Sequence, residues 1–326
     1  MQRAQYASRG PVPQAVIAAV DFTLSALRAG QALIQVLAAP INPSDVLTLT
    51  GAYGMLPALP AVGGNEGVGR IVALAADVAA SKLGQLVLLP VGSGTWSSHL
   101  IADASQLIRL PEGADVEQLA MLTVNPPTAA LLLSEFVDLK PGDWVIQNAA
   151  NSAVAGYLLQ LAHSRGLHTV NIVRRQSAVA AIAGGEVVLV DGDGLAKRVA
   201  AATGGARIRL GIDAVGGQAT DRLATALGEG ATLVNYGAMS GEPCVISPAS
   251  FVFRDITLRG FWLAQWFRRA AVERQQQIFG ELAGLVASGQ LSARIQSRFP
   301  IEQIKQAVAA AAAGERDGKI LIVPKA

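Results

Sequence analysis

The 326-residue chain is 51% hydrophobic and 15% charged, whereas charged residues make up about 25% of an average soluble protein. At roughly 150 residues per domain, this length predicts two domains with sizeable cores. The formal net charge is +2, and lysine and arginine form no block, so neither a nucleic acid nor an anionic membrane is expected as a partner.

The chain contains one cysteine, Cys244. It cannot form an internal disulfide, and a reducing compartment is its natural setting. The apolar run over residues 15–20 is too short for a signal peptide. No uninterrupted apolar stretch reaches the roughly 18 residues that would span a bilayer. We therefore expect a soluble, cytoplasmic protein.

The first 120 residues are predicted to be mainly β. Two apolar runs within residues 15–40, on either side of Arg28-Ala29-Gly30, predict a hairpin-like pair of strands. Asn42-Pro43-Ser44-Asp45 is turn chemistry suited to cap a short segment over residues 46–50. Further strands are expected at Arg70–Leu74, Leu86–Pro90 and Ser98–Ile101.

A glycine-rich loop surrounds Tyr53. Gly51-Ala52-Tyr53-Gly54 precedes two prolines and the glycine-rich run over residues 63–69. This composition predicts a loop that passes close to another group. A phenol is protonated at neutral pH and can donate a proton or a hydrogen bond to a developing oxyanion or carbanion. A tyrosine that simply packs beneath its loop is the alternative.

The second half of the chain has a different pattern. Gln118–Leu133 predicts a helix with a break at Asn125-Pro126-Pro127, and residues 144–175 predict a strand, a tight turn, a helix and a strand. Four more apolar runs, separated mostly by helical windows, lie at Val187–Val190, Arg209–Ala214, Thr232–Tyr236 and Ile256–Trp262. Six strands joined mainly by helices predict an α/β fold with a doubly wound, parallel sheet.

The segment from Ala270 onward is predicted to return to the first domain. Its expected elements are a long helix, a β-like run over Ala293–Phe299, a helix over Ile301–Ala313 and a final strand over Lys319–Val323.

The turn from Ala149 to Gly156 can place backbone N–H groups and a helix N-terminus against a phosphate. The turn lacks the G-x-G-x-x-G glycines, but its small residues permit a ligand to approach the backbone closely. Its place in a six-stranded sheet favours a dinucleotide as that ligand. A plain turn without a ligand is the alternative.

Arg174 ends the second strand of the same unit, with Arg175 beside it. NAD-specific enzymes tend to carry an acidic residue there for the ribose 2′-hydroxyl, whereas arginine favours a 2′-phosphate. The sequence therefore predicts NADP rather than NAD. A pair of solvated surface arginines is the alternative.

The histidines and the cysteine predict no metal site. His99, His163 and His168 are scattered and Cys244 stands alone, whereas zinc needs three or four clustered ligands. The aromatic run over residues 261–266, taken by itself, is more typical of core or a dimer surface than of a substrate pocket.

Several of these segments resemble the zinc-free medium-chain dehydrogenase/reductase superfamily. They are Asn42-Pro43-Ser44-Asp45, Gly51-Ala52-Tyr53-Gly54, residues 59–67 and the paired-proline turn near Asn125. Within that superfamily, residues 145–149 with Asn151-Ser152, and above all residues 259–266, are similar to the mitochondrial-type trans-2-enoyl thioester reductases. Zinc-dependent relatives have histidine where this chain has Asn65, immediately before Glu66.

The resemblance implies a GroES-like β-rich catalytic domain over residues 1–122 and 264–326, and a Rossmann NADP-binding domain over residues 123–263. It also implies a homodimer formed through the Rossmann sheets. The implied reaction is NADPH-dependent reduction of the C2=C3 double bond of an enoyl-CoA or enoyl-acyl-carrier-protein. Hydride reaches C3, charge moves toward the thioester oxygen, and C2 takes a proton.

Tyr53 matches the catalytic tyrosine of that family, the expected donor of the proton. The positions that match the family's NADPH contacts are Asn125, Asn151, Ser152, Ala153, Val154, Arg174, Arg175, Tyr236, Gly237, Ala238, Met239, Phe261, Trp262, Leu263 and Lys319. Trp262 is also expected to shape the mouth of the substrate pocket. Lys319 taken alone predicts a solvated lysine at the start of a strand.

Two departures from the family pattern concern the cofactor. Ala153-Val154-Ala155 stands where the family usually has Gly-Val-Gly, which narrows the space above the turn by two methyl groups. The segment after Arg175 is also shorter than in the family. Two alternative functions remain: a zinc-free NADPH:quinone oxidoreductase, which shares the fold, cofactor and tyrosine loop, and a non-catalytic NADPH-binding protein.

Overall fold

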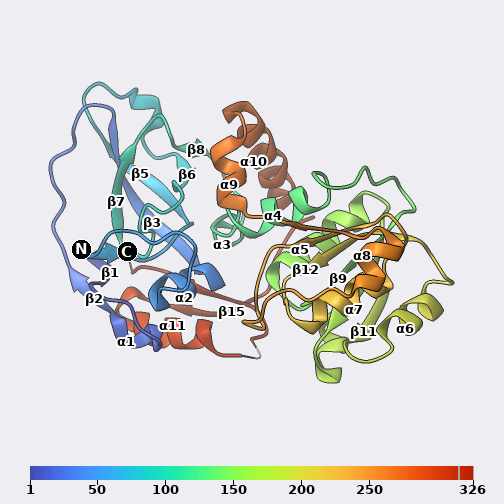
Figure 1. The fold of residues 1–326 in the computed structure, drawn as a ribbon. Helices are drawn as coiled ribbons and strands as arrows, with labels where there is room; N and C mark the ends of the chain where they lie inside the picture. Colours follow the sequence, from blue (N-terminus) through green and yellow to red (C-terminus); the bar gives the residue numbers. More distant parts are fainter. Residues whose placement is uncertain (315, 326) are drawn as a thin grey trace. The chain divides into compact units, whose positions relative to one another are not determined.

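The computed structural model describes residues 1–314 and 316–325. The chain divides into two compact units (Figure 1): the first is Met1–Val124 with Val272–Ala326, and the second is Asn125–Ala271. The first unit is therefore discontinuous in sequence, whereas the second is a single segment.

The first unit is built on two sheets. A seven-stranded sheet has the order β15-β16-β3-β5-β6-β8, with β7 also paired to β3. Its strands are β3 (Gln31–Ile41), β5 (Val68–Leu74), β6 (Leu86–Leu88), β7 (His99–Asp103), β8 (Ile108–Arg109), β15 (Ile295–Phe299) and β16 (Lys319–Ile322). A small sheet has the order β2-β1-β4, with β1 (Gln2–Tyr6), β2 (Ile17–Asp21) and β4 (Ala61–Val62).

The expected hairpin within residues 15–40 is wrong. β2 pairs antiparallel with β1, with Gln2 opposite Asp21, whereas β3 pairs with β5, β7 and β16. The segment between β2 and β3 is too long for a tight hairpin turn, so the chain changes sheets there. The predicted return of the C-terminal segment is confirmed, because β16 joins β3 with Ile320 opposite Ile41.

The helices of the first unit are short except for one of 16 residues, α10. They are α1 (Pro13–Val16), α2 (Pro43–Thr50), α3 (Val116–Leu119), α10 (Val272–Ala287) and α11 (Ile304–Ala312), with single 3₁₀ turns η1 (Ala80–Lys82) and η3 (Ile301–Gln303). α11 packs its buried Ile304 and Val308 against Ile41 and Leu49, which joins the two sequence segments of the unit in one core.

The second unit contains the predicted six-stranded parallel sheet, in the order β11-β10-β9-β12-β13-β14. The strands are β9 (Trp144–Gln147), β10 (His168–Val173), β11 (Val187–Val190), β12 (Ile208–Asp213), β13 (Thr232–Asn235) and β14 (Thr257–Gly260). The strand order changes direction between β9 and β12, the position at which open α/β sheets bind ligands beyond the carboxyl ends of their strands.

Helices lie on both faces of this sheet (Figure 1). They are α4 (Asn125–Leu132), α5 (Ala153–Ser164), α6 (Leu195–Ala202), α7 (Gln218–Ala226), α8 (Pro248–Arg254) and α9 (Leu263–Arg269), with the 3₁₀ segment η2 (Gln176–Ala181). Ile146 packs with α6 and α7, while the side chain of Gln147 donates to the carbonyl oxygen of Ala155 on α5. Successive residues of a strand point to opposite faces, so this is a doubly wound Rossmann arrangement.

The expected helix break at Asn125-Pro126-Pro127 is instead a helix start. α4 begins at Asn125 and buries Asn125 and both prolines. Proline is favoured in the first turn of a helix because the N–H groups there have no intrahelical partner. The two prolines therefore fix where α4 begins.

None of the helices in the described residues is long and apolar enough to cross a membrane.

Candidate functional site

The turn between β9 and α5 is the predicted phosphate-binding turn. Ala149 has φ +47°, in the left-handed region that favours glycine. Ser152 is the N-cap of α5, and its hydroxyl accepts from the backbone N–H of Ala155 at 3.3 Å. The strand order places the N-terminus of α5 at the switch point, where its partial positive charge favours an anion.

A buried aspartate organises the carboxyl ends of three neighbouring strands. Asp213 ends β12 and is 0% exposed. Its carboxylate accepts from the side-chain amides of Asn148, just after β9, at 2.6 Å and of Asn235, at the end of β13, at 3.0 Å. It also accepts from the Thr220 hydroxyl at 2.6 Å. The backbone N–H groups of Val215 and Gly216 donate to it at 2.8 and 3.1 Å.

This network joins the loops that carry the predicted cofactor residues of the second unit. The side-chain amide of Asn235 also donates to the carbonyl oxygen of Gly237 at 2.9 Å, and the backbone carbonyl oxygen of Asn235 accepts from the N–H of Phe261 at 2.9 Å. The hydroxyl of Tyr236 is hydrogen-bonded to Ser152, and burial raises the pKa of Tyr236. Ser152, Tyr236, Gly237 and Phe261 are thus tied together at one edge of the sheet.

The remaining cofactor candidates of this unit lie on the same loops or next to them. Asn151 is exposed, Ala153 is half-buried, and Val154 is buried in the first turn of α5. Ala238 and Met239 are exposed on the loop after β13, and Met239 is the more prominent, at 64% exposure. Asn125 is buried at the start of α4.

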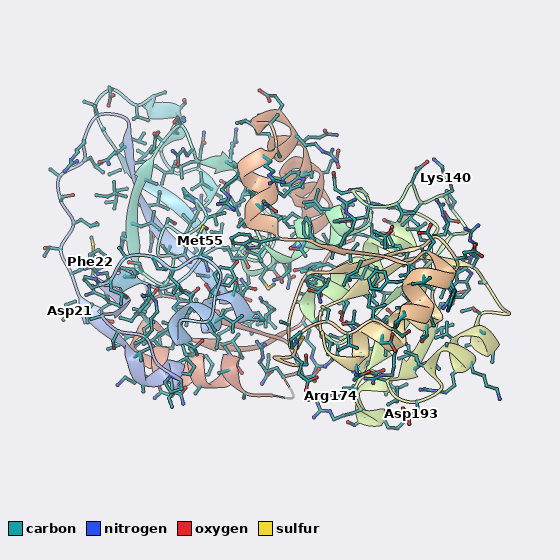
Figure 2. All side chains as sticks on the ribbon, viewed as in Figure 1. Asp21, Phe22, Met55, Lys140, Arg174 and Asp193 are labelled. Atoms are coloured by element: carbon teal, nitrogen blue, oxygen red, sulfur yellow. The ribbon has the colours of Figure 1, made fainter. Side chains whose placement is uncertain are left out.

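Arg174 and Arg175 directly follow β10, next to the phosphate turn. Figure 2 shows Arg174 on the surface of the second unit, where its side chain is exposed. The N–H of Ala150, in the turn, donates to the carbonyl oxygen of Ile172 on β10 at 3.0 Å, which ties the two segments together. An accessible guanidinium at this point is suited to bind a phosphate in a bidentate manner.

Aromatic and cation–π contacts hold the run that follows β14. The ring of Phe136 contacts Phe261 edge to face at 5.9 Å, and the guanidinium of Arg259 lies 5.0 Å from the centroid of the Phe136 ring. The guanidinium of Arg268 lies 5.2 Å from the Trp262 ring. Leu263 begins α9 and is half-buried. Residues 261–263 are therefore held in place directly beyond the carboxyl end of β14.

Tyr53 lies in the first unit, on the loop that leaves α2. Gly51 ends the helix in the left-handed region at φ +85°. The N–H groups of Ala52 and Tyr53 both donate to the carbonyl oxygen of Leu47, at 2.9 and 3.2 Å. The backbone of Tyr53 is thus anchored to the last turn of α2, while its side chain is partly exposed. Met55 of the same loop is visible in Figure 2.

Lys319 is not the solvated lysine that its sequence position alone predicts. It starts β16 and is 5% exposed. Its ammonium donates to the side-chain oxygen of Asn42, and the carboxyls of Asp45 and Glu66 lie nearby. Burial lowers the pKa of Lys319 to about 8 and raises that of Asp45 to about 7, and it also raises the pKa of Glu66.

The described residues contain no group of three or more His, Cys, Asp or Glu side chains placed to hold a metal ion. Asn65, which stands where zinc-dependent relatives have histidine, donates its amide to Asp45 at 2.6 Å.

Sequence reasoning missed the Asp213 network, although it contains a recognisable signal. β12 and β13 end in Asp213 and Asn235, and Asn148 follows β9 directly. The carboxyl ends of parallel strands lie at one edge of a sheet, so polar residues at three such ends are expected to meet.

Two family models match the chain. The alcohol dehydrogenase GroES-like domain covers residues 28–112, and the zinc-binding dehydrogenase domain covers residues 184–322. The human mitochondrial enoyl-[acyl-carrier-protein] reductase is 36% identical over 312 residues, covering 91% of this chain and 82% of the relative.

Two solved structures share the fold over their whole length. A candidate NADPH:quinone reductase from Bacillus thuringiensis superposes with a TM-score of 0.90 at 25% identity, covering 99% of both chains. The mitochondrial 2-enoyl thioester reductase heterodimer of Candida tropicalis gives a TM-score of 0.88 at 24% identity, also covering 99% of both chains.

A chain that contains both a GroES-like unit and a six-stranded Rossmann sheet, together with these matches, is a medium-chain dehydrogenase/reductase. Within this superfamily, the chain belongs to the family of the mitochondrial-type enoyl-[acyl-carrier-protein] reductases.

Proposed function

We propose that the protein is an NADPH-dependent oxidoreductase that reduces the C2=C3 double bond of trans-2-enoyl thioesters to give acyl thioesters. The observation that carries this proposal is the 36% identity to the human mitochondrial enoyl-[acyl-carrier-protein] reductase over 91% of the chain. The carrier of the acyl group is CoA or an acyl carrier protein. A solved neighbour of the same fold is a complex with NADP and crotonyl-CoA.

The proposed roles of the residues follow from their chemistry. NADPH, when bound, supplies the hydride that C3 of the enoyl group accepts. The N-terminus of α5 and the small residues at its start accommodate the pyrophosphate, and Arg174 with Arg175 binds the 2′-phosphate. Tyr53 donates a proton to C2, which completes the addition of one hydride and one proton across the double bond.

The turn of this chain fits such a cofactor even though Ala153 and Ala155 replace the usual glycines. Ala155 is turned into the protein and is 1% exposed, so its methyl group contributes to the core rather than to the space above the turn. Ala153 is half-buried at the first position of α5. Of the two added methyl groups, only that of Ala153 borders the proposed pyrophosphate site.

The 2′-phosphate assignment is tested by Arg174→Asp. The substitution replaces an attractive charge with a repulsive one, so the Kd for NADPH is expected to rise about 10-fold to 100-fold, while the Kd for NADH stays within about threefold. Isothermal titration calorimetry measures both constants. Lys197→Asp on α6, also exposed, makes the same charge change elsewhere in the unit and controls for net charge. Equal NADPH affinity in Arg174→Asp and wild type would refute the assignment.

The overall proposal is tested against the alternative acceptor. With NADPH oxidation followed by absorbance, crotonyl-CoA is expected to be reduced with a higher kcat/KM than 1,4-benzoquinone. Preference for the quinone would establish the NADPH:quinone reductase that the Bacillus thuringiensis neighbour suggests. Binding of NADPH without oxidation by either acceptor would indicate a non-catalytic NADPH-binding protein.

We also propose a homodimer that forms through the second unit. β14 is an edge strand of the six-stranded sheet, and three of its four residues are exposed. The neighbouring helix α8 exposes Phe251, Val252 and Phe253, the last two at 70% and 80%. An exposed apolar helix beside an unpaired strand edge is suited to bury itself against a second copy of the same surface.

The dimer proposal predicts that Phe253→Asp gives a monomer at micromolar concentration, because an unpaired carboxylate would be buried at the centre of the interface. Sedimentation velocity gives the mass of the assembly. Val272→Asp, at a residue that is 61% exposed in the first unit, serves as the control and is expected to leave the mass unchanged. A monomeric wild type would refute the proposal.

Activity is proposed to be independent of zinc, because Asn65 occupies the position of a zinc-ligating histidine in zinc-dependent relatives. The kcat is therefore expected to survive dialysis against a chelator.

A cytoplasmic location is proposed because the cysteine of the chain, Cys244, is a free thiol on the surface, which suits a reducing compartment. Cell fractionation tests this location against the mitochondrial location of the curated relatives.

A further inference from the structure

We propose that Asn65, acting through Asp45, is a positioning residue for Tyr53: it anchors the N-terminus of α2, the helix whose C-terminus holds the tyrosine. This inference rests on the proposed function for the role of Tyr53. The anchor itself consists of contacts within the first unit, and hydrogen exchange can test it without any substrate.

The anchor begins at a capping box. Asn42 and Asp45 cap the N-terminus of α2 reciprocally, and the backbone N–H of Asn42 donates to Asp45 Oδ2 at 2.7 Å. The other oxygen, Asp45 Oδ1, accepts from Asn65 Nδ2 at 2.6 Å. Asn65 lies outside the helix, on the loop between β4 and β5. It therefore connects the cap of α2 to the seven-stranded sheet.

The second half of the anchor fixes Asn42. Its Nδ2 donates to Glu66 Oε1 at 2.6 Å, and its side-chain oxygen accepts from Lys319 Nζ. Glu66 Oε2 accepts from the backbone N–H groups of Thr123 and Val124 at 3.0 and 2.9 Å. The start of α2 is thus held by residues from the loop before β5, from the segment after α3 and from β16.

The other end of α2 carries the tyrosine. The helix spans only Pro43–Thr50, so a change at its first turn is transmitted to its last turn within about 12 Å of helix length. The last turn holds the backbone of Tyr53 through the carbonyl oxygen of Leu47. A tilt of α2 therefore displaces the phenol, and a displacement of about 1 Å can cost up to about 100-fold in rate.

The carboxyl group of Asp45, which caps α2, is costly to bury. Asp45 is 3% exposed, and burial raises its pKa to about 7, so ionised Asp45 at neutral pH is unfavourable for folding. An apolar contact would fix the helix at lower cost. Each carboxyl oxygen of Asp45 accepts one hydrogen bond, Oδ2 from the backbone N–H of Asn42 and Oδ1 from the side-chain amide of Asn65.

The first test is Asn65→Ala, which removes the link and leaves the reciprocal cap intact. The kcat for crotonyl-CoA reduction is expected to fall about 10-fold, with the KM for NADPH unchanged. Hydrogen exchange followed by mass spectrometry is expected to show faster exchange over residues 43–54. Asp115→Ala is the matched control, because Asp115 caps α3 in the same unit through the N–H groups of Glu117 and Gln118 and, among the described residues, makes no hydrogen bond or ion pair with α2.

The second test is Asn65→Asp, which places a second carboxyl group next to the carboxyl group of Asp45. The ionisable groups that act on Asp45 are Glu66 and Lys319. Tyr6 also faces Asp45, but burial raises the pKa of Tyr6, so it is neutral between pH 6 and 8, and it is hydrogen-bonded to Arg9. The charge of Arg316 lowers the pKa of Lys319. At pH 6 the two carboxyls can share one proton and preserve the link, whereas at pH 8 they repel each other. The ratio of variant to wild-type kcat is therefore expected to fall as the pH rises from 6 to 8.

The two readouts separate this inference from the proposed function. If the wild type does not reduce crotonyl-CoA, the proposed function fails, and the exchange rates over residues 43–54 still decide whether Asn65 anchors α2. Unchanged exchange in Asn65→Ala would overturn the anchor. A fall in kcat of the same size in Asp115→Ala would overturn it as well, because the effect would then be general destabilisation.

Discussion

Replacing Tyr53 with phenylalanine is expected to lower the kcat for crotonyl-CoA reduction about 100-fold or more, the scale of general acid catalysis. The substitution keeps the ring and removes only the hydroxyl. The backbone of Tyr53 is fixed by its hydrogen bond to the carbonyl oxygen of Leu47, which the change does not touch. The loss is therefore expected in kcat, with the KM for NADPH nearly unchanged.

Steady-state kinetics with NADPH and crotonyl-CoA measure both constants. Tyr157→Phe provides the control, because it removes the hydroxyl of a tyrosine that is buried in α5 and 1% exposed. A Tyr53→Phe enzyme with wild-type kcat would reduce the tyrosine to a packing role. If the variant still binds crotonyl-CoA but leaves NADPH unoxidised, the hydroxyl is required for turnover rather than for binding.

Asp213→Ala is expected to have the largest effect on stability in the second unit, lowering its free energy of unfolding by about 3 to 5 kcal/mol. The aspartate is fully buried, and its carboxylate accepts from side chains that follow or end β9 and β13 and from the backbone N–H groups of Val215 and Gly216. Removal of the carboxylate leaves these donors buried without their acceptor, which costs more than the loss of a surface contact.

Urea unfolding of the variant and the wild type measures this loss. The relevant transition is the one that saturating NADPH shifts, because a ligand stabilises the unit that binds it. Asp138→Ala is the control: its carboxylate is 79% exposed and pairs with Lys140, so a change below about 1 kcal/mol is expected. If Asp213→Ala unfolded at the same midpoint urea concentration as the wild type, the structural role of the network would be contradicted.

The Asp213 substitution is also expected to weaken NADPH binding. The side-chain amide of Asn235 connects the carboxylate to Gly237, and the backbone carbonyl oxygen of Asn235 accepts from the N–H of Phe261. These loops carry the proposed cofactor residues, and their geometry depends on the network.

The strands of the second unit were predictable because each is a short apolar run between turns or helices, and all six lie where such runs occur in the sequence. The tight turn between β9 and α5 was also predictable, although Ala149 takes a backbone conformation that usually calls for glycine. The pairing of β2 was not predictable from local pattern. Its partner β1 ends at Tyr6, β2 begins at Ile17, and helix α1 lies between the two strands. An apolar run does not specify which neighbouring strand it will pair with.

Buried polar contacts were the part least accessible to sequence reasoning. Lys319 at the start of β16 has the sequence context of a surface lysine, and its burial depends on Asn42 and Glu66, which are more than 250 residues away in sequence. A residue's partners over such distances follow from the sheet topology, here the pairing of β16 with β3. The family resemblance proposes Tyr53 and the cofactor candidates as site residues, but it does not indicate the residues that hold them in place.

The discontinuity of the first unit has a consequence for biosynthesis. β3 acquires its partner β16 only when residues 319–322 have been made, and the same segment brings Lys319 to the anchor of α2. The second unit is a single segment that has been synthesised by then, and domains generally fold in the order of their synthesis. We therefore expect the Rossmann unit to fold on the ribosome first, and the tyrosine-bearing unit to be completed only near the end of translation.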